Sequence, residues 1–301
     1  MRSMLALVIF TSFASAQTPA VEANVKAKLA TLKFVGGLYD PETGGYRNEP
    51  TAKPSLRATN AAVKTTKYLG GKLDDKEKTS KFVLSCYDDK TGAFAEPGGK
   101  PDVTITSIGV LAAMELSIAK EKVVLASKYI SENAKTFEEI RIGAAAVEAW
   151  GGPLEWETHL DHWRTEILFL SFKRTKSDKP QDDVRELSSF AATCLRLAGS
   201  GSESESERKS YLRIVFDGQR DDGGWGKAGE KASDMESVYR VMRAIYMLKS
   251  KPKDPAKLRE FIAKHRNDDG GFAVKPGEKS SAAGTYYAVI VLKWLDEPEK
   301  Q

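Results

Sequence analysis

Cysteine and histidine are scarce in this chain of 301 residues, which has two cysteines and three histidines. Cys86 and Cys194 stand far apart, and neither belongs to a Cys-x-x-Cys or zinc-ribbon spacing. A zinc ribbon is therefore excluded. The sequence leaves two interpretations of these thiols open: they pair in a disulfide, or they are buried as small apolar side chains.

An excess of one charge is also missing. The 46 basic residues are nearly balanced by 42 acidic ones, which gives a formal net charge of +4. No cluster of lysine and arginine with interleaved aromatic residues stands out. We therefore expect no nucleic-acid partner.

The N-terminus has a short apolar run of a recognisable kind. Arg2 is followed by the apolar residues 4–10 and then by Ala14-Ser15-Ala16 before Gln17, a pattern typical of a signal peptide with its cleavage site. The run is too short to span a bilayer. We predict a signal peptide over residues 1–16, cleaved after Ala16, and one exported domain over residues 17–301 that has no membrane span and lies in the periplasm or outside the cell.

A glycine-aromatic turn recurs along the chain. Four such turns run from Asp40 to Tyr46, from Asp88 to Phe94, from Asp221 to Trp225 and from Asp268 to Phe272. The aromatic residues are 48 positions apart in the first pair and 47 in the last pair, a spacing that fits a repeated pair of helices. The whole chain has room for about six such units.

The helices between these turns are of two kinds. Residues 257–264 are apolar on one side only, whereas residues 103–119 and 285–295 are apolar nearly all round and are expected to be buried. This alternation predicts an all-α fold with an outer and an inner ring of helices. We interpret the turn aromatics as plugs between neighbouring helical hairpins.

At residues 54–59, 219–225 and 267–277 the chain resembles the β-subunits of protein prenyltransferases, especially type II geranylgeranyltransferase. More loosely it is similar to the repeats of squalene and terpene cyclases. The resemblance covers most of the chain outside residues 1–16. It implies an α/α toroid of six helical hairpins whose inner helices line an aromatic-walled central cavity.

In the prenyltransferase family an Asp, a Cys and a His hold a zinc ion that activates the acceptor thiol, while basic side chains hold the diphosphate. The resemblance places Lys231 on the diphosphate lysine and Asp234 on the zinc aspartate. Glu236 falls on the zinc cysteine, and Gly284 falls on the zinc histidine. Since one zinc ligand of three is retained, we expect no metal and no other cofactor. Asp234 and Glu236 are the weak candidates for a metal or a catalytic role.

Other chemistry fits the residues less well. His159 and His162 share a helix face but have no third ligand at a suitable spacing, so surface or packed histidines are expected. Class II cyclases use an Asp-x-Asp-Asp acid, whereas adjacent aspartates in this chain form pairs only. A Cys-Gly-Glu-Gln thioester stretch is absent.

These observations lead to three hypotheses. The first is a binding protein whose cavity takes an unknown ligand, such as an isoprenoid or a peptide, through Lys231, Tyr239, Arg240, Tyr286 and Tyr287. The second is a divergent prenyltransferase that transfers an isoprenoid to a thiol and needs zinc. The third is a carbohydrate-active toroid that uses carboxylates such as Asp102 and Glu236.

Overall fold

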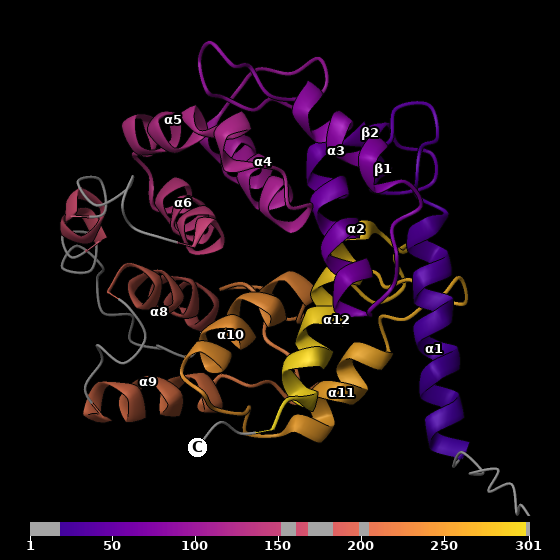
Figure 1. Cartoon of the computed structure of the whole chain (residues 1–301). Helices are drawn as coiled ribbons and strands as arrows, with labels where there is room; N and C mark the ends of the chain where they lie inside the picture. Colours follow the sequence, from indigo (N-terminus) through magenta and orange to yellow (C-terminus); the bar gives the residue numbers. More distant parts are fainter. Residues whose placement is uncertain (1–18, 152–160, 168–182, 199–204, 299–301) are drawn as a thin grey trace, which may run out of the picture.

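The computed structural model describes residues 19–151, 161–167, 183–198 and 205–298 (Figure 1). Its helices alternate between an outer and an inner layer. The outer helices are α1 (Pro19–Gly36), α3 (Lys76–Ser85), α5 (Leu125–Asn133), α9 (Glu205–Asp217) and α11 (Pro255–Ala263), and residues 161–167 are also helical. The inner helices are α2 (Leu56–Tyr68), α4 (Val103–Glu115), α6 (Phe137–Trp150), α8 (Val184–Ala198), α10 (Met235–Met247) and α12 (Ala282–Asp296).

Within this part of the chain the inner helices close a ring. Each inner helix packs against the next one along the sequence, and α12 packs against α2. Figure 1 shows the ring around the middle of the molecule, with α1, α5, α9 and α11 outside it. The remaining elements are a 3-10 helix (Lys120–Val123) and two short antiparallel strands, β1 (Tyr46–Arg47) and β2 (Pro54–Ser55). The predicted α/α toroid of about six hairpins is confirmed.

Five inner helices begin in the same way, at a side chain that accepts a backbone N–H from the first turn. Ser55 accepts from Ala58 at 3.1 Å, and Asp234 accepts from Ser237 at 2.8 Å. The same bond begins α4 at Asp102, α6 at Thr136 and α12 at Ser281. Such a cap supplies one of the acceptors that the first turn of a helix lacks.

The turn aromatics are buried at the joints between hairpins. None is more than 2% exposed, and the set comprises Tyr46, Phe94, Trp225 and Phe272. The Phe94 N–H donates to the Thr106 hydroxyl of α4 at 3.0 Å, and the same bond joins Tyr46 to Thr59 and Phe272 to Thr285. These three residues are thus fixed through their backbone to the inner helix that follows them, whereas the Trp225 ring donates to the Val215 carbonyl of α9 at 3.0 Å. The interpretation of these aromatics as plugs is confirmed.

The first glycine of each turn presses against the next outer helix. Gly223 has a φ of +88°, and a Cβ there would lie 2.3 Å from the Lys257 carbonyl oxygen on α11. Gly270 has a φ of +86°, and its Cβ would lie 2.6 Å from the Ala30 carbonyl oxygen on α1. Both the backbone conformation and the close approach require glycine. The last turn therefore docks on the first helix.

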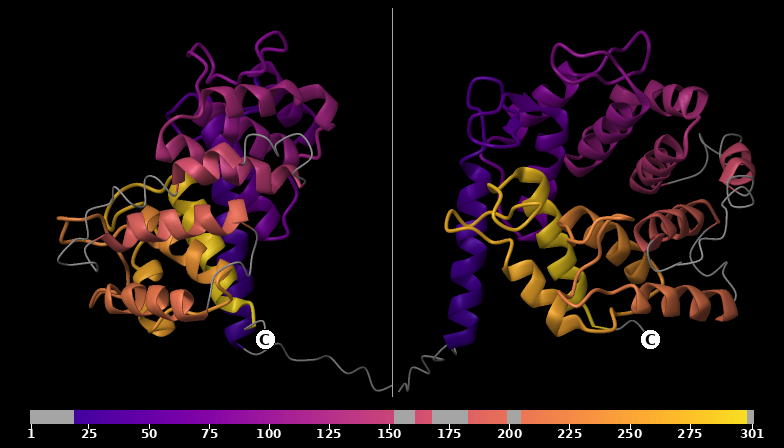
Figure 2. Two further views of the ribbon diagram at one scale, coloured as in Figure 1. Left: turned by 90° about the vertical axis from the view of Figure 1, so that its left-hand side faces the viewer. Right: turned by 180° about the vertical axis from the view of Figure 1, so that it is seen from behind.

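Hydrogen bonds complete this closure between the two ends of the chain. The Thr31 hydroxyl donates to the Gly270 carbonyl at 2.8 Å, and Arg266 donates to the Ala27 carbonyl at 2.7 Å. Figure 2, seen from behind, shows α1 running alongside the last hairpin. Residues more than 230 positions apart are joined here, so the ring depends on tertiary contacts rather than on the chain connection.

One boundary differs from the sequence analysis. The inner helix expected over residues 103–119 ends at Glu115, since Leu116 caps it and Ser117 has a φ of +59°. Another helix, α9, begins at Glu205. Glu205 and Glu207 lie in its first turn, where the positive end of the helix dipole favours carboxylates.

Residues 1–16, expected to be a signal peptide, lie outside the described residues. Cys86 is buried, Cys194 is partly buried, and both are free thiols. Burial raises the pKa of each thiol to about 11. Among the helices that the structure describes, none is both long enough and apolar enough to cross a bilayer.

Candidate functional site

The middle of the ring contains two adjoining cavities that are lined by inner helices. The N-terminal chamber has a volume of about 250 Å³ and is lined by the first halves of α2, α4, α10 and α12, with part of α6. The C-terminal chamber, of about 210 Å³, is lined by later residues of α2, α4, α6, α8 and α10. Lys64, Arg141, Tyr239 and Arg240 line both chambers. These residues therefore mark the waist between the two spaces.

Five of the seven predicted site residues reach this space. Glu236, Tyr239, Arg240, Tyr286 and Tyr287 line the N-terminal chamber. They project from α10 and α12, which pack side by side. The resemblance and the buried character of these helices were the signals that identified them.

The other two lie elsewhere. Lys231 is exposed on the loop before α10 and does not line either chamber. Asp234 is only 2% exposed and caps the N-terminus of α10. One of its carboxylate oxygens accepts the Ser237 N–H and the other accepts the Ser237 hydroxyl, each at 2.8 Å. Asp102, named for the carbohydrate hypothesis, caps α4 in a similar way through the Ile105 N–H at 2.7 Å.

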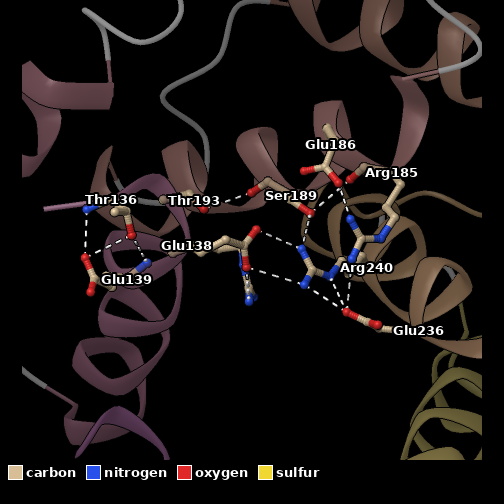
Figure 3. A network of polar contacts seen from close by, with 10 residues as sticks. Thr136, Glu138, Glu139, Arg185, Glu186, Ser189, Thr193, Glu236 and Arg240 are labelled. Carbon is tan, nitrogen blue, oxygen red and sulfur yellow. Dashed lines mark hydrogen bonds and ion pairs between the residues drawn. The ribbon is translucent and has the colours of Figure 1, made fainter. Parts of the chain in front are cut away.

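Glu236 belongs to an ion-pair network that joins three inner helices (Figure 3). Its Oε1 atom lies 2.8 Å from Arg240 and 3.1 Å from Arg185 of α8. Arg240 also contacts Glu138 of α6 at 3.0 Å. Arg240 therefore lies between two carboxylates, and its guanidinium joins α6 to α10.

The charges in this network hold its carboxylates ionised. Burial by itself would raise the pKa of Glu236, but Arg240 and Arg185 hold it below its ordinary value. Burial would likewise raise the pKa of Glu138, but Arg141 and Arg240 lower it overall. Each of these cations has a protein partner, so the network stabilises the ring.

Aromatic rings form one wall of the site. Tyr239 stacks on Tyr287 with ring centroids 5.0 Å apart and on Trp294 at 5.9 Å, and Trp294 stacks in turn on Tyr246 at 5.2 Å. The Tyr286 hydroxyl donates to the Tyr239 hydroxyl at 3.3 Å. This stack runs along the contact between α10 and α12. Of its rings, Tyr239, Tyr286 and Tyr287 line the chambers and offer them flat apolar surface with a few polar atoms.

The basic side chains of the cavity wall differ in whether they have a carboxylate partner. Six basic side chains of the described residues line the chambers: Arg57, Lys64, Arg141, Arg196, Arg240 and Arg243. Four of them pair with carboxylates. No carboxylate of the described part of the chain lies within ion-pair distance of the other two, Lys64 and Arg243.

Lys64 and Arg243 both face the aromatic wall. The Lys64 Nζ atom lies 5.9 Å from the ring centroid of Tyr286. The Arg243 guanidinium lies 4.9 Å from the Trp294 ring and 5.9 Å from the Tyr239 ring. Lys64 is only 7% exposed, and burial lowers its pKa. Burial would raise the pKa of Tyr239, but Arg243 and Lys64 lower it overall, which reports an excess of positive charge.

The sequence analysis missed both of these cations. Lys64 follows Ala61, Ala62 and Val63 on an inner helix, and Arg243 stands one turn after Tyr239. A charged residue within the most buried stretch of an inner helix is the signal that could have found them.

The histidines do not gather. His162 is exposed, and His265 is buried with its Nδ1 atom 2.8 Å from the Phe261 carbonyl oxygen. His159 lies outside the described residues. Where the chain is described, no three His, Cys, Asp or Glu side chains group closely enough to bind a metal ion.

Comparison with known proteins agrees with this architecture. None of the curated proteins matches the chain in sequence. A solved structure of a variant of the type II terpene cyclase MstE from Scytonema, in complex with its substrate geranylgeranyl dihydroxybenzoate, superposes with a TM-score of 0.58. The two are 10% identical, and the similarity covers 93% of this chain and 98% of the cyclase. At this identity the likeness shows a shared fold.

The sequence model of the prenyltransferase alpha-alpha toroid domain matches residues 2–153 and 165–301. These residues include all six inner helices of the ring and the turns that join them. The chain therefore belongs to the prenyltransferase alpha-alpha toroid domain family.

Proposed function

We propose that this chain is an exported binding protein that holds a ligand in its central cavity and lacks zinc-dependent prenyl transfer. The observation that carries the proposal is the hydrogen bonding of the Asp234 carboxylate. Both of its carboxylate oxygens accept hydrogen bonds from Ser237 of its own helix. Export rests on the signal sequence over residues 1–16.

The side chains at the expected metal position do not fit a catalytic zinc. Asp234 has the environment of a helix cap, as Ser55, Asp102, Thr136 and Ser281 have in other inner helices. The Oε1 atom of Glu236 is held between two guanidinium groups. Zinc would have to displace these partners from both carboxylates.

The cavity supports binding instead. Its aromatic wall suits an apolar ligand, and the similar cyclase was solved with a substrate that carries a geranylgeranyl group. An isoprenoid is thus the first ligand to test, and a short peptide is the second.

Binding is tested by equilibrium titration with a fluorescent isoprenoid. Ala283 lines the N-terminal chamber, so Ala283→Trp should fill it and weaken binding at least about tenfold. Ala263→Trp is the matched control, because Ala263 is exposed on the outer helix α11. Equal affinity of both variants and the wild type would place the ligand outside the cavity and contradict the proposal.

Transfer is tested with geranylgeranyl diphosphate, a thiol peptide and added zinc. We expect no alkylated peptide and less than stoichiometric zinc after dialysis. Asp234→Asn separates the alternatives, since asparagine keeps the cap but is a poor replacement for a zinc carboxylate. A wild type that binds one zinc and alkylates the peptide, with both properties lost in Asp234→Asn, would establish the divergent transferase.

A further inference from the structure

Within the described residues, two buried cations in the central cavity lack the carboxylate partners that their neighbours have. Lys64 is 7% exposed and lines both chambers, while Arg243 lines the C-terminal chamber. The buried Nε–H group of Arg243 has no hydrogen-bond acceptor in the part of the chain that the structure describes. A buried charge without a partner costs stability, so its presence calls for a reason other than folding.

The carboxylates nearby are already engaged. Glu115 lies 2.6 Å from Lys67, and Glu148 lies 2.8 Å from Arg196. Both pairs also line or flank the C-terminal chamber. Among the residues that the structure describes, no carboxylate therefore lies within ion-pair distance of Lys64 or Arg243, and Glu148 attracts both only from farther away.

We infer that Lys64 and Arg243, with the hydroxyl of Tyr239, form an anion-binding site on the C-terminal side of the waist of the cavity. It takes the carboxylate or phosphate end of an amphipathic ligand. Lys64 and Arg243 supply charge-assisted donors to the oxyanion, and the rings of Tyr286 and Tyr239 hold the apolar part beside it. This inference rests on the proposed cavity binding and adds the charge of the ligand.

The surroundings of Tyr239 agree with this assignment. The two cations draw its phenol toward ionisation, although burial opposes this. A carboxylic or phosphoric acid ionises far more readily than a phenol. A ligand oxyanion is thus the more favourable partner for the same two charges.

The site is tested with three small probes that share an aryl iodide. 4-Iodobenzoate carries a carboxylate, 4-iodophenyl phosphate carries a phosphate, and 4-iodobenzyl alcohol is neutral. Calorimetric titration gives the affinities, and anomalous scattering from iodine in soaked crystals locates each probe. We expect at least one anionic probe to bind in the cavity about tenfold or more tightly than the alcohol. Which anion binds more tightly distinguishes carboxylate from phosphate ligands.

Variants assign the effect to the two cations. Lys64→Met and Arg243→Gln should each weaken the anionic probe about tenfold and leave the alcohol unchanged. Lys81→Met is the control, because it removes a positive charge from the exposed surface of α3. Anion binding should also raise the pKa of Tyr239, measured by phenolate absorbance, since it neutralises the charges that lower it.

The outcomes separate this inference from the proposed function. If all three probes bind in the cavity equally, or Lys64→Met leaves the anion affinity unchanged, the anion site is wrong while cavity binding stands. If the probes fail and a fluorescent isoprenoid still occupies the cavity, the anion site is again wrong. If neither the probes nor the isoprenoid enters the cavity, the proposed function itself is overturned.

Discussion

The cations of the ring occupy two regions with opposite surroundings. Near the start of α10, Arg240 and Arg185 lie against Glu138 and Glu236 (Figure 3). In the C-terminal chamber, Lys64 and Arg243 face tyrosines and no carboxylate of the described residues. The paired region joins helices, and the unpaired region remains available to a ligand. The role of a charged side chain inside this fold therefore depends on whether a side chain of opposite charge lies beside it.

The largest expected effect comes from breaking the paired region. Arg240→Ala leaves Glu138 and Glu236 without their shared partner and should lower the free energy of unfolding by about 2–4 kcal/mol, a range reduced by the partial exposure of the carboxylates. Urea denaturation at pH 7 measures it. Arg213→Ala, which alters an exposed arginine of α9, should stay within about 0.5 kcal/mol of the wild type. Equal losses in both variants would contradict the structural role of the network.

The next largest effect is expected at Asp234, a carboxylate that belongs to neither region. Asp234→Ala removes the cap of α10 and the bond to the Ser237 hydroxyl, so we expect a loss of about 1–2 kcal/mol in unfolding free energy. Asp234→Asn should recover most of it, because an amide oxygen can accept the same N–H. Thermal and urea unfolding compare the three proteins. Failure of asparagine to restore stability would show that the negative charge, and not the cap, is required.

The unpaired region should respond in the opposite direction. Lys64→Met replaces a buried ammonium by an apolar side chain of similar length, so the free energy of unfolding should rise by about 1 kcal/mol. The same variant should lose anion binding. A marked loss of stability on this substitution would mean that Lys64 stabilises the folded state. The two regions would then no longer differ in their effect on stability.

The smallest effect is a pH dependence confined to the paired region. Because its cations hold the pKa of Glu236 below the ordinary value near 4.3, ionised Glu236 contributes stability above that pH and loses it as the pH falls through the lowered pKa. Glu236→Gln should therefore be less stable than the wild type by about 1 kcal/mol at pH 7. The difference should shrink as the pH falls through the lowered pKa of Glu236, and urea unfolding at a series of acidic pH values tests this. A difference that persists in acid would assign the loss to packing.

The fold could be predicted because its signals are local and repeated. Each Asp-Gly-Gly turn needs positive φ at one glycine, and each aromatic that follows is large enough to require a partner helix. The same regularity placed Tyr239, Tyr286 and Tyr287 on inner helices. Where the repeat is imperfect, as before α6, the sequence analysis found no turn, although Thr136 and Glu139 form a capping box there.

Within the sequence alone, the periodic turns determined the toroid, the family and the aromatic wall. Which charges are paired was decided only by the tertiary structure. Arg240 and Glu138 are 102 positions apart, and Lys64 meets Tyr286 from the opposite end of the chain. Ion pairing depends on distances of a few ångströms between side chains, and a closed ring sets those distances by bringing together helices that the sequence keeps far apart.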